Sequence, residues 1–167
     1  MNHRGFLLIE VSITAMVLAF GVAALMSAFV LTLKANKASE QMKVATQLST
    51  ALLEEIRLHR WDSFTPTPSA AITQGSAVLG PDSGEVATDK RMFNDIDDFN
   101  GWRESAVLDP MMQPLAGFPG YSRSVTVSYV TAALVTSASP TDYKQVTVCT
   151  LTPKNKQVCL NTLFTNR

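Results

Sequence analysis

Side chains that bind transition metals or act as nucleophiles are scarce in this 167-residue sequence. It contains two cysteines, Cys149 and Cys159, and two histidines, His3 and His59, which lie far apart. A zinc site needs several such ligands close together, so none is expected. A glycine-rich phosphate loop, a nucleophile elbow and a catalytic Cys-His arrangement are also missing. We therefore expect neither an enzyme nor a bound cofactor.

An excess of charge of either sign is also lacking. The 14 Lys and Arg residues balance the 14 Asp and Glu residues. Proteins that bind nucleic acid typically carry a strong basic patch, because the phosphate backbone supplies much of the affinity. We expect no nucleic acid among the partners of this chain.

Charge is almost absent from the N-terminal part of the sequence. Between Phe6 and Leu33 the one charged side chain is Glu10. The apolar run over residues 11–33 has about 23 residues and is about 34 Å long as a helix, which crosses a bilayer once. A carboxylate beside such a run is costly to bury without a partner. Glu10 is therefore the first candidate functional residue.

Proline and glycine are absent from residues 22–64. After the apolar run, apolar residues recur every three or four positions, at Ala38, Met42, Ala45, Leu48, Leu52 and Ile56. This spacing is typical of an amphipathic helix. We predict one continuous helix from Phe6 to Arg60, with a membrane-spanning part over 6–33 and an amphipathic part over 34–61.

The chain begins with a short basic segment and a distinctive spacing of glycine and acid. The segment MNHRG ends in Gly5, Phe6 follows, and Glu10 lies four residues further on, ahead of the apolar run. This pattern resembles the N-terminus of type IV pilins and pseudopilins. The resemblance implies a leader over residues 1–5, cleavage by a prepilin peptidase between Gly5 and Phe6, and N-methylation of Phe6.

Removal of the leader would expose an ammonium group on Phe6, one helical turn from Glu10. We expect Glu10 to pair with the ammonium of a neighbouring subunit and to set the register between helices. In the membrane, before assembly, we expect it to reach the headgroups instead. The basic residues Lys34, Lys37 and Lys43 favour an orientation opposite to the one that the leader implies.

The rest of the chain, residues 62–167, is predicted to be a globular head. Residues 62–120 begin with a segment rich in Ser, Thr, Pro and Gly and are predicted as a variable loop, with a short strand near Ala77–Leu79. Residues 121–167 contain three alternating runs, SVTVSYV, KQVTVCTLT and QVCLNTLF, which are typical of half-buried antiparallel strands. The predicted fold class is α+β, a long helix on a small antiparallel sheet, and the resemblance implies the type IV pilin fold.

Cys149 and Cys159 fall on the last two predicted strands, on either side of the turn Pro153-Lys154-Asn155-Lys156. A cross-strand disulfide forms there if the register includes an odd-numbered loop or a bulge. An exported head favours oxidation, and pilins commonly carry a cysteine pair near the C-terminus. The alternative is a pair of reduced thiols in a cytosolic protein.

The segment MFNDIDDFNGWRE concentrates oxygen ligands at Asp95, Asp97 and Asp98. Carboxylates at this density suit calcium, but the spacing of the helix-loop-helix calcium motif is missing. The alternative, which we favour, is that the acids cap a turn while the apolar residues between them enter the core, namely Phe93, Ile96, Phe99 and Trp102. This segment also resembles one in minor pilins of the mannose-sensitive haemagglutinin type.

These features together predict a minor pilin or pseudopilin. It would reside in the bacterial inner membrane as a single-pass protein with its head in the periplasm, and then enter a pilus or pseudopilus, with an assembly-priming, tip or adhesion role. Expected partners are the prepilin peptidase, other subunits, the inner-membrane assembly platform and membrane lipid. The alternatives are a major pilin, a type II secretion pseudopilin, and a membrane-anchored periplasmic binding domain that never polymerises.

Overall fold

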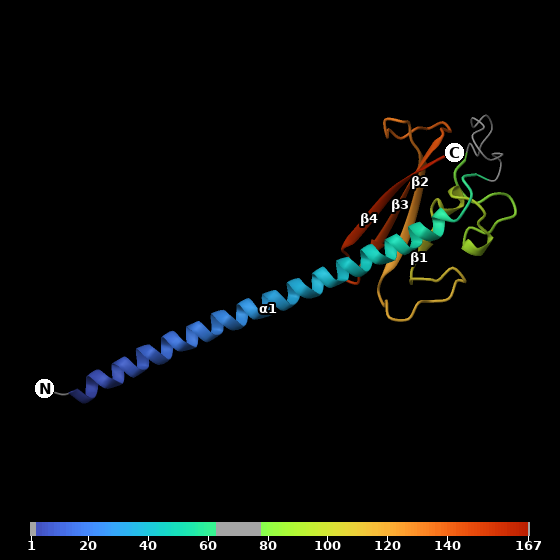
Figure 1. Cartoon of the computed structure of the whole chain (residues 1–167). Coiled ribbons are helices and arrows are strands. Elements are labelled where there is room, and N and C mark those ends of the chain that lie inside the picture. The colour runs from blue at the N-terminus through green and yellow to red at the C-terminus, as the bar shows by residue number, and fades with distance from the viewer. Residues whose placement is uncertain (1–2, 63–77, 167) are drawn as a thin grey trace. The chain divides into compact units, whose positions relative to one another are not determined.

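The computed structural model describes the backbone of residues 3–62 and 78–166, and side chains within these ranges from Ile9 onward. The elements in chain order are one helix, two short 3-10 helices and four strands: α1 (His3–Arg57), η1 (Lys90–Met92), η2 (Asp97–Phe99), β1 (Arg103–Glu104), β2 (Ser122–Tyr129), β3 (Tyr143–Leu151) and β4 (Gln157–Thr165). The chain divides into two units, Met1–Gln41 and Met42–Arg167, and Figure 1 traces the elements of both.

The first unit consists of the N-terminal part of α1, which is long and apolar enough to cross a membrane once. Its apolar side chains are exposed, for example Leu25 at 73%. Three hydroxyl groups in this part bond to the helix itself, since Thr14, Ser27 and Thr32 donate to the carbonyl oxygens four residues earlier. Such back-bonding satisfies a hydroxyl without water, so these residues are compatible with a lipid environment.

The second unit joins the last turns of α1 to an antiparallel sheet with strand order β1-β2-β3-β4. The sheet is a meander, because each strand after β1 pairs with the one that precedes it in the chain. Side chains alternate between a buried and an accessible face along β2 and β3, as expected of a sheet with one face on a core. The α+β layout predicted from the sequence is therefore confirmed.

The core lies between the buried stripe of α1 and the inner face of the sheet. Leu52 and Ile56 of α1 are fully buried and join a cluster with Val125 of β2 and Val146 of β3. Four further members come from the segment between helix and sheet, as the sequence predicted: Phe93, Ile96, Phe99 and Trp102. Phe93 packs edge to face against the rings of both Phe99 and Trp102.

Three local features differ from the sequence-based expectations. The helix ends at Arg57, three residues before Arg60, and its last turn tightens as the N–H groups of Leu58 and His59 bond three residues back. Val78 and Leu79 are not in a strand, and Ala77 lies outside the described residues. A two-residue strand, β1, extends the sheet beside β2, and no alternation in the sequence marks it because it is so short.

Buried polar side chains connect the layers of the second unit. Lys144 of β3 is fully buried, and its ammonium lies 2.5 Å from Oδ1 of Asp97, 3.6 Å from Oδ2 of Asp62 and 2.6 Å from the carbonyl oxygen of Trp61. Ser49 of α1 forms a 2.7 Å hydrogen bond with Thr150 of β3. These contacts fix η2 and the end of α1 against the sheet.

Candidate functional site

Glu10 lies in the exposed apolar part of α1, with Ile9 and Val11 more than half exposed on either side. The helix begins at His3, so the backbone on both sides of the Gly5–Phe6 bond is helical. The side chain of Phe6 lies outside the described side chains. The cleavage, methylation and pairing expected at Gly5, Phe6 and Glu10 all involve another protein, so they stay predictions.

Cys149 and Cys159 form a disulfide between β3 and β4. The two residues are direct partners in the strand register, with a Cα–Cα distance of 4.0 Å. Leu151 pairs with Gln157, so the hairpin loop over 152–156 has an odd number of residues. The disulfide predicted for an odd-numbered loop is thus present, on the sheet face away from the core.

The three acids that the sequence grouped together take different partners. Asp97 pairs with Lys144. Asp95 and Asp98 instead join Asp82, and one carboxylate oxygen from each of these three residues lies within 4.8 Å of the others. Asp95 and Asp98 are buried, while Asp82 is half-buried. Sequence reasoning missed Asp82, because its 13-residue distance from Asp95 forms no recognisable motif.

Backbone hydrogen bonds fix the orientation of the buried acids. Oδ2 of Asp98 accepts from the N–H groups of Asn94 at 2.8 Å and Asp95 at 3.0 Å. Oδ1 of Asp95 accepts from the N–H of Asp97 at 3.0 Å. The acids therefore do close a turn, as the sequence suggested. Oδ1 of Asp98 is buried and accepts no hydrogen bond from the residues that the structure describes.

Burial changes the acidity of these groups. It raises the pKa of Asp98 to about 7, and the Asp95 charge and the Glu85 carboxyl add to the rise, although the N–H groups of Asp95 and Asn94 oppose it. Burial also raises the pKa of Asp97, and the Lys144 ammonium counteracts that rise. The Asp82–Asp95–Asp98 cluster therefore favours an added positive charge, either a proton or a cation.

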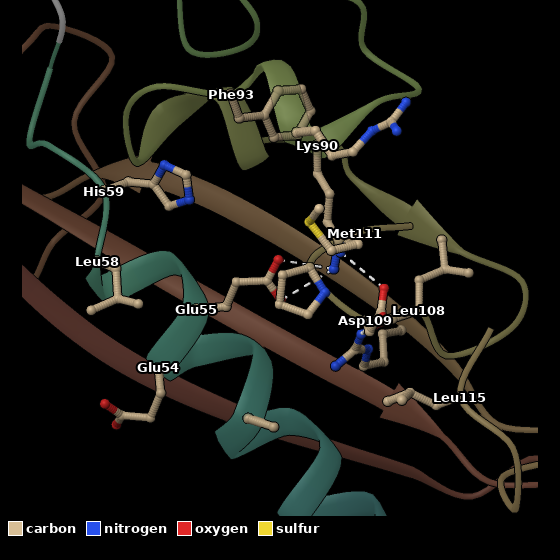
Figure 2. A pocket seen from close by; sticks show the side chains of 14 residues that line it. Glu54, Glu55, Leu58, His59, Lys90, Phe93, Leu108, Asp109, Met111 and Leu115 are labelled. Carbon is tan, nitrogen blue, oxygen red and sulfur yellow. Dashed lines mark hydrogen bonds and ion pairs between the residues drawn. The ribbon is translucent and has the colours of Figure 1, made fainter. Parts of the chain in front are cut away.

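A groove of about 810 Å³ lies beside the end of α1 in the second unit. Figure 2 shows Glu55 and Lys90 directed toward one another there. The exposed side chains of Leu58 and Met111 also line the groove. Lys90 lies 2.9 Å from Oε1 of Glu55 and 3.3 Å from Oε1 of Glu104. The groove contains no nucleophile–base pair among its described lining residues.

The chain matches no family model, no curated protein and no solved structure in the three comparisons made with it.

Proposed function

We propose that this chain is a minor pilin or pseudopilin, a subunit that moves from the bacterial inner membrane into a type IV pilus or a related filament. The observation that carries the proposal is the two-part character of α1. One helix is exposed and apolar from Ile9 to Leu33 and then has a fully buried stripe at Ala45, Leu52 and Ile56. Such a helix presents a free apolar surface while its other end belongs to a folded head.

Glu10 supports an assembled state rather than a simple anchor. An anchor needs only apolar residues and interfacial anchoring side chains, whereas Glu10 is the one charged side chain between Phe6 and Leu33. Paired with the ammonium of Phe6 on a neighbouring subunit, its carboxylate is neutralised in an apolar filament core. The role is structural rather than catalytic, in assembly priming, at a tip or in adhesion.

The processing step is tested by mass spectrometry of the chain expressed with a prepilin peptidase. We expect a mature protein that starts at N-methylated Phe6. Gly5→Ala and larger substitutions should leave the leader attached, whereas Gly21→Ala should be processed normally, because a Cβ at Gly21 meets no other atom within 4 Å. Normal trimming of Gly5→Val, or a wild-type chain that retains Met1, contradicts the proposal and favours the membrane-anchored binding domain.

The filament step is tested by shearing filaments from cells and probing them for this chain. Glu10→Ala should insert into the membrane but enter filaments poorly. Glu40→Ala is the matched control, since Glu40 is an exposed acid on the same helix outside the apolar run. Equal incorporation of both variants contradicts the pairing role of Glu10. The amount of this chain relative to other subunits separates a minor from a major pilin, and the type of filament separates a pilus subunit from a type II secretion pseudopilin.

A further inference from the structure

The cluster of Asp82, Asp95 and Asp98 gathers three carboxylates from two segments of the head. Asp82 lies before η1, Asp95 lies just before η2, and Asp98 is part of η2. Calcium takes oxygen ligands at about 2.3 to 2.6 Å, so two ligands of one ion are at most about 5 Å apart. The three oxygens lie within 4.8 Å of one another. Their spacing therefore fits a single shared ion.

A second observation points to a ligand at this place. Asp98 is 1% exposed, and its Oδ2 is held by two backbone N–H groups. Its Oδ1 is buried and accepts no hydrogen bond from any residue in the described ranges. A buried carboxylate oxygen normally has a partner, because burial without one is costly. The neighbouring Asp97 shows the usual solution, an ion pair with Lys144.

Glu85 places a fourth carboxylate at the rim of the cluster. Its Oε2 accepts from the N–H of Asp82 at 3.1 Å, and its Oε1 accepts from the side chain of Asn94 at 2.6 Å. Glu85 also contacts the Asp98 carboxyl. The cluster is therefore strongly anionic and made only of oxygen ligands, which suit a hard divalent cation and not zinc or copper.

We propose that Asp82, Asp95 and Asp98 bind one Ca²⁺, with water completing the coordination, and that this ion joins the loop before η1 to η2. Calcium rather than magnesium is assigned because Mg²⁺ demands near-ideal octahedral geometry and keeps most of its water. Three protein carboxylates on one ion exceed the one or two that Mg²⁺ usually takes. The inference does not depend on the proposed filament role, because it concerns only the folded head.

The competing occupant is a proton shared between Asp98 and Glu85. Burial raises the pKa of Asp98 to about 7, so at neutral pH a proton and a cation compete for this carboxylate. The variant Asp98→Asn distinguishes a bound cation from a bound proton. It keeps the side-chain shape, and its oxygen still accepts from the backbone, but it removes the charge and puts an NH₂ group where the ion would bind. The variant should fold at least as well as the wild type without calcium, since it relieves repulsion between buried acids.

The test is thermal unfolding of the full chain in detergent micelles at pH 8, with CaCl₂ or MgCl₂ added to metal-free protein, together with titration calorimetry. With a Kd near that of extracellular calcium modules, about 10⁻⁴ to 10⁻³ M, saturating Ca²⁺ should raise Tm by about 5 to 10 °C. Asp98→Asn should lose this shift. A wild type without any shift, or an equal shift in Asp98→Asn, overturns the proposal, and an equal shift with Mg²⁺ overturns the assignment to calcium.

Two further variants distinguish an effect on calcium binding from an effect on the stability of the fold. Asp109→Asn is the matched control, because one oxygen of Asp109 likewise accepts two backbone N–H groups, from Met111 and Gln113, but outside the cluster. It should keep the full calcium shift. Asp97→Asn should lower Tm at every calcium concentration and still show the shift, because Asp97 pairs with Lys144. If Asp109→Asn also loses the rise in Tm with calcium, the assignment of the ion to Asp82, Asp95 and Asp98 is wrong.

Discussion

Arg123 lies 2.6 Å from Oε2 of Glu104, and both side chains are sealed from solvent. The same carboxylate accepts from Lys90, from the indole N–H of Trp102 and from the backbone N–H of Leu108. Arg123 also donates to the carbonyl oxygens of Leu48 and Leu108. Lys90 also pairs with Glu55 of α1. Acidic and basic side chains therefore alternate along one buried network, which links α1, η1, β1 and β2 through Glu55, Lys90, Glu104 and Arg123.

Glu104→Gln should therefore be strongly destabilising although it keeps the shape of the side chain. It leaves the buried cations Arg123 and Lys90 without their shared carboxylate, and breaking a buried pair in this way costs about 3 to 5 kcal/mol. The measurement is urea unfolding of the full chain in micelles, followed by tryptophan fluorescence. Glu54→Gln, which removes the exposed pair with Arg57, is the control and should have little effect. Similar losses of unfolding free energy in Glu104→Gln and Glu54→Gln would contradict this account.

Lys144→Met should also destabilise the head by about 3 to 5 kcal/mol, because the acids Asp62 and Asp97 stay buried without their cation. The cost should depend on pH. Without the ammonium, the folded state holds a proton on Asp97 more tightly than the unfolded chain does, so stability rises as pH falls. The pKa of Asp97 is raised to about 8 even beside Lys144, so the difference from wild type should narrow as pH falls toward 8 and stay constant at lower pH in denaturation curves. A difference that is constant above pH 8 as well would show that the lost contact between the ammonium and the Trp61 ring dominates.

Periodicity and turn chemistry in the sequence predict most of the fold. The stripe through Leu48, Leu52 and Ile56 predicts the buried face of α1, and the alternation in residues 122–129 predicts β2. Both patterns are local, with spacings set by the backbone geometry of a single element. The odd-numbered loop after Leu151 likewise determines how Cys149 and Cys159 face each other.

The polar sites of the head could not be predicted in the same way. Lys144 occupies an inward position of β3 where the alternation alone would place an apolar residue, and its partners Asp62 and Asp97 come from distant segments. Asp82 joins Asp95 and Asp98 only because the loop before η1 folds back against η2. Such pairings depend on tertiary contacts, and spacing along the chain carries no trace of them.

The disulfide should stabilise the head without determining its register. Cys149 and Cys159 close a short loop between strands that already pair along their whole length, so its loss should cost about 2 to 3 kcal/mol. The double variant Cys149→Ala/Cys159→Ala should unfold at the same urea concentration as reduced wild type. Reductant should shift the wild type and leave the double variant unchanged. If reductant also shifts the unfolding of the double variant, its effect on the wild type does not come from the Cys149–Cys159 disulfide.

His59 should make the head less stable in acid. Burial lowers its pKa below 6.5, and the nearby acids Glu55, Asp95 and Glu85 counteract this only in part. As pH falls through 6.5, the unfolded chain takes up a proton that the folded chain resists, so the free energy of unfolding falls. His59→Phe keeps a ring against Phe99, which His59 contacts edge to face at 5.0 Å, and removes the titration. Between pH 7.5 and 5.5 the wild type should therefore lose more stability than the variant, as measured by urea unfolding at each pH. Parallel pH profiles for the two proteins would contradict a depressed His59 pKa.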